Sequence, residues 1–267
     1  MLAEHKQIES NNGVVHYWIN RNVMKDAKFI IFTHGLTANH TMFEKQVEYF
    51  ASKYSVITWD VPLHGLSRPY QDFSYYHTAV ELRTILNQEK IDKVILVGMS
   101  MGGYPSQEFA RLYPDLVEGF VALDTTPFGP NYYSRSDLWW LKQVAPMANW
   151  FTDGMLRKSM AKSVSKTKYS YEKMMEMLAP LTKAQIIEQM DLAYGVFAKE
   201  NKEVSFTFPV LLLLGEHDTT GKVKHYNEEW SKRTGYPLHL IKNAAHLSNG
   251  DNPEQVNGEI EAFIQRL

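Results

Sequence analysis

The sequence predicts an α/β protein with a mostly parallel central sheet that is flanked by helices. Short apolar runs alternate with segments in which apolar residues recur at helical spacing, and this alternation favours parallel strands joined by crossover helices. An apolar run at residues 94–97 leads into Gly-x-Ser-x-Gly and a helix-compatible segment. Residues 125–207 interrupt the alternation with helical patterns alone. We therefore expect one sheet with a long helical insertion.

Composition and charge exclude several classes of protein. The chain has 267 residues, 44% of them hydrophobic, which is enough for one large α/β core. Its formal net charge of −2 gives no overall field for nucleic acid or an anionic membrane, so recognition depends on a local site. There is no cysteine, and the histidines and carboxylates match no metal-ligand spacing. We expect no metal, no cofactor and no nucleic-acid partner.

The beginning of the chain carries no signal of export. Residues 1–10 are polar and lack the apolar core of a signal peptide. No run approaches the ~20 apolar residues of a membrane span. These patterns favour a cytoplasmic protein without a membrane span.

The first half of the chain alternates strands and helices. We expect an edge strand at 14–20 and, because a near-continuous apolar run suits a parallel strand covered on both faces, a buried strand at 28–33. Helical spacing follows at 42–53, a strand at 55–60, a helix at 74–89 and a strand at 94–97. After the helix at 105–113, residues 118–124 read as another buried strand.

The insertion and the last part of the chain complete the pattern. The predicted helices of the insertion are 138–151, 155–164, 171–178 and 183–198, and the insertion holds seven of the twelve methionines. The sheet resumes at 209–218, followed by a helix at 223–233, a strand at 237–242 and a last helix at 253–267. A helical insertion between two strands is placed to cover the C-terminal edge of the sheet, where open α/β sheets bind ligands.

The motif Gly98-x-Ser100-x-Gly102 lies between a strand and a helix, as a nucleophile elbow requires. A serine at the tip of so tight a turn has a strained backbone, so its neighbours must lack a Cβ atom. The turn places the N–H of Met101 at the start of the helix, where it faces an oxyanion. Gly35 follows the strand at 28–33 and presents the N–H of Leu36 as a second donor.

Two more polar residues follow predicted strands at the same edge of the sheet. Asp218 comes just after one strand and His246 just after the next. With Ser100 they form the order Ser, Asp, His of a catalytic triad. Asp124 also ends a strand and is an alternative acid, although the run from Gly215 to Asp218 favours Asp218. We interpret His64, in a loop of turn formers, as a structural histidine.

Five motifs in order make the chain resemble a capped member of the α/β-hydrolase superfamily. They are His34-Gly35, Asp60-x-Pro62-x-His64-Gly65-x-Ser67, Gly98-x-Ser100-x-Gly102-Gly103, Gly215-Glu216-x-Asp218, and His246 with Pro253-Glu254 and Asn257. The resemblance implies a hydrolase core at 1–124 and 208–267 and a helical cap at 125–207, inserted between the strand that ends at Asp124 and the one that starts at Pro209. It departs from the family pattern at Leu63 and Ala245, where glycine is frequent.

The resemblance implies Ser100 as nucleophile, His246 as base, Asp218 as its orienting acid, and the N–H groups of Leu36 and Met101 as oxyanion hole. The expected function is a serine hydrolase that cleaves a small, fairly apolar ester or related acyl compound through an acyl-Ser100 intermediate. Carbon–carbon bond hydrolysis, thioester hydrolysis and a lyase reaction use the same triad and stay open. A triad-bearing small-molecule receptor or signalling protein is the alternative outside enzymes.

The cap carries the information on substrate. We expect substrate-binding residues among its aromatic side chains, about a third of which should face the substrate while the rest pack the cap. The candidates are Phe128, Tyr132, Trp139, Trp140 and Trp150. A basic stretch runs from Arg157 to Lys168 without an acid, and we interpret it as a solvated face in preference to an anion site.

Overall fold

The computed structural model describes residues 3–24 and 26–267. Within these ranges a single eight-stranded sheet has the order β1-β2-β4-β3-β5-β6-β7-β8, in which the pairs β1–β2 and β2–β4 are antiparallel and the remaining pairs are parallel. The predicted fold class is confirmed. The strands are β1 (Glu4–Ser10), β2 (Gly13–Asn20), β3 (Phe29–Thr33), β4 (Ser55–Trp59), β5 (Val94–Met99), β6 (Val117–Leu123), β7 (Val210–Gly215) and β8 (Leu238–Ile241).

The expectation that residues 14–20 form an edge strand is wrong. β2 lies second from the edge, between β1 and β4, because the polar start of the chain forms β1 and pairs with it from Glu4 to Ser10. β1 has the alternation of an edge strand in which Ile8 alone is fully buried. A strand with one buried side chain carries almost no apolar signal in the sequence.

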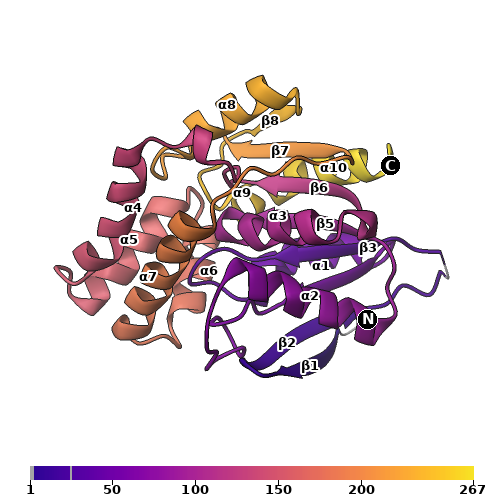
Figure 1. The fold of residues 1–267 in the computed structure, drawn as a ribbon, viewed down its shortest axis with the longest axis horizontal. Coiled ribbons are helices and arrows are strands. Elements are labelled where there is room, and N and C mark those ends of the chain that lie inside the picture. The colour runs from indigo at the N-terminus through magenta and orange to yellow at the C-terminus, as the bar shows by residue number, and fades with distance from the viewer. Residues whose placement is uncertain (1–2, 25) are drawn as a thin grey trace.

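Helices cover both faces of the sheet (Figure 1). On one face lie α2 (Tyr75–Glu89), α3 (Gly103–Leu112) and α8 (Val223–Thr234), whose apolar side chains share one core cluster. On the other lie α1 (Glu44–Phe50) and α10 (Pro253–Ile264) in a second cluster, with the short α9 (Ser248–Asp251) before α10. Successive strand residues such as Ile30 and Ile31 alternate between the two clusters, as the period of two requires.

The helical insertion predicted between Asp124 and Pro209 consists of α4–α7 (Figure 1). Each helix starts at a serine or threonine whose side-chain oxygen accepts a backbone N–H of the first turn, which satisfies a donor that the helix leaves free. The helices are α4 (Arg135–Ala148), α5 (Asp153–Val164), α6 (Lys168–Leu178) and α7 (Lys183–Glu200). They gather at the end of the sheet where β5, β6 and β7 finish.

The helices in the described ranges differ from membrane-spanning segments in length and polarity. None in the described ranges combines the length and the apolar character needed to cross a bilayer. The longest, α7, has 18 residues, and charged side chains interrupt it.

Candidate active site

Ser100 lies at the tip of a sharp turn between β5 and α3. Its φ of 50° is in the left-handed region that ordinary side chains rarely adopt. The turn leaves no space for a side chain at either glycine. A Cβ atom on Gly102 would lie 2.1 Å from the carbonyl oxygen of Thr33, and one on Gly98 would lie 2.7 Å from the carbonyl oxygen of Gly102. Glycine at both positions is therefore a steric requirement of the elbow.

The structure brings the three predicted triad residues together. His246 Nε2 lies 2.8 Å from Ser100 Oγ, and His246 Nδ1 lies 2.7 Å from Asp218 Oδ2. The second carboxylate oxygen of Asp218 accepts the backbone N–H of Thr220 at 2.8 Å. Because an ionised carboxylate only accepts, Nδ1 donates to Asp218 and Nε2 is left to accept the proton of Ser100.

Charge and burial set the protonation of this pair. Burial disfavours the charged imidazole, but the charge and hydrogen bond of Asp218 outweigh it and raise the pKa of His246 above its usual value. Burial raises the pKa of the Asp218 carboxyl, but the charge and hydrogen bond of the His246 imidazole outweigh burial and hold this pKa below its usual value. The arrangement favours an ionised Asp218 next to a histidine that readily takes a proton.

Asp124, the alternative acid, is fully buried and does not contact His246 among the described residues. One of its oxygens accepts the N–H of Gly215 at 2.7 Å, and the other accepts the N–H and hydroxyl of Ser248. Burial, aided by the Asp218 carboxylate, raises the pKa of Asp124 to about 7, although the charge of His246 opposes the rise. Asp124 therefore ties together the two loops that carry the acid and the base.

The N–H groups predicted to bind an oxyanion belong to Leu36, after β3, and Met101, at the elbow. In the part of the chain that the structure describes, neither donates a hydrogen bond to a protein acceptor. Both residues line a cavity together with Ser100. Two free donors next to a nucleophile are the geometry that stabilises the tetrahedral intermediate of acyl transfer.

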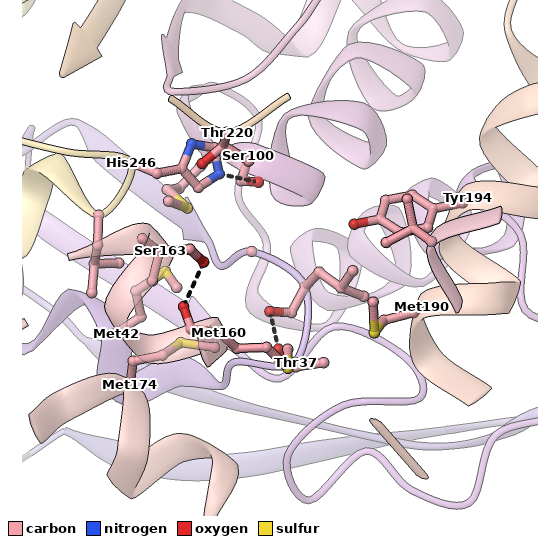
Figure 2. A pocket seen from close by; sticks show the side chains of 16 residues that line it. Thr37, Met42, Ser100, Met160, Ser163, Met174, Met190, Tyr194, Thr220 and His246 are labelled. Carbon is pink, nitrogen blue, oxygen red and sulfur yellow. Dashed lines mark hydrogen bonds between the residues drawn. The ribbon is translucent and has the colours of Figure 1, made fainter. Parts of the chain in front are cut away.

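Two cavities meet at Ser100. The first has a volume of about 250 Å³, and Figure 2 shows several of its side chains. Its lining is mainly apolar, with Thr37 and Ser163 as polar neighbours. Five methionines from the core and the cap dominate it: Met42, Met99, Met160, Met174 and Met190. We call it the methionine cavity.

The second cavity, of about 290 Å³, lies between the sheet edge and helices α4 and α7. Tyrosines are its most frequent lining residue, and we call it the tyrosine cavity; they are Tyr75, Tyr104, Tyr133, Tyr194 and Tyr226. Leu36, Ser100, Tyr194 and His246 line both cavities. A substrate whose reacting carbon lies at Ser100 thus has space on two sides.

Tyr194 on α7 differs from the other tyrosines at this junction. The hydroxyls of Tyr75, Tyr104 and Tyr133 have hydrogen-bond partners in the protein. That of Tyr194 has none among the described residues, and Figure 2 shows it directed into the methionine cavity. Sequence reasoning missed this residue, although its position one turn after Met190 places both on the same helix face.

None of the five cap residues predicted to bind substrate lines either cavity at Ser100. Phe128 is buried against the rings of Tyr104 and Phe197, where it packs the core. Tyr132 packs at the margin of the core with the guanidinium of Arg233 4.5 Å from its ring centre. Neither lines a cavity at Ser100.

The three tryptophans of the cap lie on its surface. The exposed fractions are 56% for Trp139, 59% for Trp140 and 82% for Trp150. The physical reason is the helical period: α4 turns Leu138, Leu141 and Val144 toward the tyrosine cavity, which directs the two residues between them outward.

The basic stretch divides into two parts. The Arg157 side chain is mostly buried, donates to the carbonyls of Leu178 and Leu181, and pairs with Asp153. The lysines of the basic stretch are exposed, as a solvated face requires. His64 is buried outside both cavities, with Nδ1 3.1 Å from the carbonyl oxygen of Pro62.

The family described as alpha/beta hydrolase fold matches residues 28–253. The chain belongs to this family. The match includes Ser100, Asp218 and His246 as well as the whole cap.

This α/β-hydrolase is related to lactonases and esterases. It is 24% identical over 256 residues to 3-oxoadipate enol-lactonase 2 of Acinetobacter baylyi. The matched region covers 91% of this chain and 90% of the relative. A thermophilic esterase from Thermogutta terrifontis has a TM-score of 0.76 and 21% identity, over 98% of each chain. A carboxylesterase from Bacillus subtilis has a TM-score of 0.74 and 20% identity, over 99% of this chain and 92% of that one. At such identities the solved structures show a shared fold.

Proposed function

We propose that this α/β-hydrolase is a serine hydrolase that cleaves small, fairly apolar carboxylic esters. The observation that carries the proposal is the continuous hydrogen-bonded chain from Ser100 through His246 to Asp218, at the junction of two cavities. A serine hydroxyl is a weak nucleophile at neutral pH, and this chain of contacts is what activates it. The esterases and lactonases among its relatives support the same reaction class.

The reaction follows from the positions of the groups. Ser100 Oγ attacks the carbonyl carbon while His246 Nε2 takes the hydroxyl proton, and the oxyanion binds the N–H groups of Leu36 and Met101. The carbon–oxygen bond to the alcohol breaks, and His246 returns the proton to the departing alkoxide. Water then attacks acyl-Ser100 with His246 again as base, which releases the acid and restores the serine.

The two cavities correspond to the two arms of an ester. The methionine cavity offers an adaptable apolar lining and suits the acyl chain. The tyrosine cavity also contains Asp137 and Lys222, which form an ion pair, and this more polar surface suits the alcohol that must leave to water. A volume of about 250 Å³ on the acyl side favours short to medium chains.

The test is a panel of p-nitrophenyl acetate, butyrate and octanoate, measured on the wild type and on Ser100→Ala. We expect turnover by the wild type and its loss in Ser100→Ala with an unchanged thermal unfolding temperature, because Ser100 Oγ contacts only His246 in the described structure. A fluorophosphonate should label the wild type, with the adduct mapped to Ser100. Residual turnover above about a tenth of the wild type contradicts the assignment of the nucleophile.

The alternatives give different results in the same experiment. Labelling of Ser100 without turnover of any ester indicates a receptor that has kept the triad. Turnover of a matched acyl thioester well above that of the oxygen ester indicates a thioesterase, and cleavage of a β-diketone in preference to both indicates a carbon–carbon bond hydrolase.

A further inference from the structure

The outer side of the cap exposes an unusual concentration of large apolar side chains. Twelve large hydrophobic residues are exposed in the described ranges, and six of them lie within residues 139–155. Single exposed apolar residues are ordinary, but a contiguous group marks a site of interaction. We call this group the tryptophan patch; it consists of Trp139, Trp140, Met147, Trp150, Phe151 and Met155.

The patch is separate from the substrate cavities. None of its residues lines the methionine or the tyrosine cavity. It occupies the outer side of α4, the turn at 149–152 and the start of α5, whereas the inner side of α4 faces the tyrosine cavity. The exposed parts of these side chains therefore contact neither substrate cavity.

Basic residues border the patch. Lys142 lies between Trp140 and Met147, and Lys158 and Lys162 continue the exposed side of α5 beyond Met155. All three lysines are exposed, and none forms an ion pair with a described residue. The acid at the start of α5, Asp153, is paired with Arg157 at 2.9 Å and so offers them no counter-charge.

We propose that the tryptophan patch binds the surface of a bilayer that contains anionic phospholipid. Tryptophan is enriched where a protein meets the lipid headgroups, because its ring is apolar and its N–H is polar. Lysines next to such rings attract anionic headgroups. A protein partner fits less well, since Lys142 lies within the patch and the cores of protein interfaces are depleted of lysine. The local charge acts at short range, so the net charge of −2 does not oppose it.

Binding in this orientation brings the substrate site to the lipid. Helix α4 carries the patch on one side and lining residues of the tyrosine cavity on the other. A bound bilayer therefore lies one helix diameter, about 10 Å, from a cavity that accepts apolar esters. The surface interaction itself does not depend on the proposed hydrolase reaction and is measured without it.

The experiment is co-sedimentation of the whole chain with vesicles of phosphatidylcholine alone and of phosphatidylcholine mixed with phosphatidylserine. We expect binding to the mixed vesicles, with a blue shift of tryptophan fluorescence, and little binding to phosphatidylcholine. Trp150→Ala should weaken binding at least about fivefold through lost apolar burial. Lys158→Gln and Lys162→Gln should each weaken it about fivefold, and high salt should weaken it further.

Matched controls separate the patch from general charge and stickiness. The pair Lys224→Gln and Lys242→Gln changes the net charge equally at exposed lysines on other elements. Leu240→Ala removes an exposed leucine from β8. These variants should bind as the wild type does. Because every changed residue is exposed, circular dichroism should show all variants folded.

Two results overturn the proposal. One is the absence of vesicle binding, or a loss that is the same for the patch variants and the controls. The other is a dimer in gel filtration with light scattering that Trp150→Ala converts to a monomer while vesicles bind neither form, which makes the patch an interface between copies of this chain.

Discussion

The edge of the sheet and the cap meet at Ser100, but they are built in opposite ways. At the sheet edge Ser100, His246 and Asp218 form a chain of hydrogen bonds, and Asp124 fixes the loops of Asp218 and His246 to each other. The cap contributes methionines, one phenol without a partner and an apolar outer surface. For the proposed reaction, catalysis depends on this hydrogen-bonded frame of the sheet edge, whereas selectivity depends on the apolar lining that the cap contributes.

The largest effect should follow from breaking the frame at Asp218. Asp218→Asn removes the charge that stabilises the imidazolium and favours the wrong tautomer of His246, so kcat should fall by a factor on the order of 10⁴. Ester turnover under saturating substrate measures it. The control is Asp124→Asn, which keeps the pairing of His246 with Asp218. Asp124→Asn should lower the unfolding temperature, and it should lower kcat much less than Asp218→Asn does. A larger loss of kcat in Asp124→Asn than in Asp218→Asn transfers the role of acid to Asp124.

The frame was predictable from the sequence because backbone geometry determines it. A buried strand must end where its apolar run ends, and parallel strands end at one edge of the sheet. The elbow needs glycine at positions 98 and 102 for steric reasons that hold whatever surrounds it. Short local patterns therefore predicted that Ser100, Asp218 and His246 lie at one edge of the sheet, and in the structure the side chain of His246 is within hydrogen-bond distance of the other two. The paired role of Asp124 was not, since its partner Ser248 is distant in the sequence.

The side chains of the cap were harder to place, because aromatic character alone does not tell which side of a helix faces inward. The spacing of apolar residues along a helix does indicate which side faces inward. On α5, Leu156, Met160 and Val164 recur every four residues and lie inward, while Met155 falls outside this series and is exposed. A period count on α4 excludes its two tryptophans from the cavity in the same way. β1 had no comparable signal, because tertiary pairing determines it.

Two methionines of the same helix test the role of the cap lining. Met160 lines the methionine cavity, and Met155 is 58% exposed on the other side of α5. Met160→Ala should shift the preference between butyryl and octanoyl esters toward the longer chain by about ten- to two-hundred-fold at most, since apolar contacts discriminate by ~1–3 kcal/mol per methylene. Met155→Ala should leave the ratio of kcat/KM values unchanged. If both variants keep the wild-type ratio of kcat/KM values for the butyryl and octanoyl esters, the cap only covers the site and does not select the acyl chain.

The pH dependence reports on the frame. His246 must be neutral to accept the proton of Ser100, and its pKa is raised above 6.5 by Asp218. The kcat/KM should therefore fall as the pH falls through a value above 6.5, by about tenfold per pH unit at the acid side. In Asp218→Asn the fall should move to lower pH. Because Asp124 has a pKa of about 7, Asp124→Asn is the control, and a fall that disappears in this variant assigns the titration to Asp124.

The smallest predicted effect concerns the one polar group that the cap directs at the junction of the cavities. The hydroxyl of Tyr194 has no described protein partner, and burial raises its pKa to about 12, so it stays a neutral donor at any working pH. A donor left unpaired beside the nucleophile is stabilised by a substrate that supplies an acceptor. Tyr194→Phe removes this donor and keeps the ring.

We expect Tyr194→Phe to lower kcat/KM by about two- to tenfold for esters whose acyl chain carries an oxygen close to the scissile bond, as one hydrogen bond contributes about 0.5–1.5 kcal/mol. The variant should hydrolyse esters that lack this oxygen at the same rate as the wild type does. The unfolding temperature should not decrease, because no protein contact of the hydroxyl is lost. Tyr75→Phe is the matched control: its hydroxyl donates to the carbonyl of Ala193 at 3.0 Å, so this variant should be less stable without discriminating between the two ester classes. If Tyr194→Phe lowers stability or affects both classes equally, the phenol supports the cap and does not recognise the substrate.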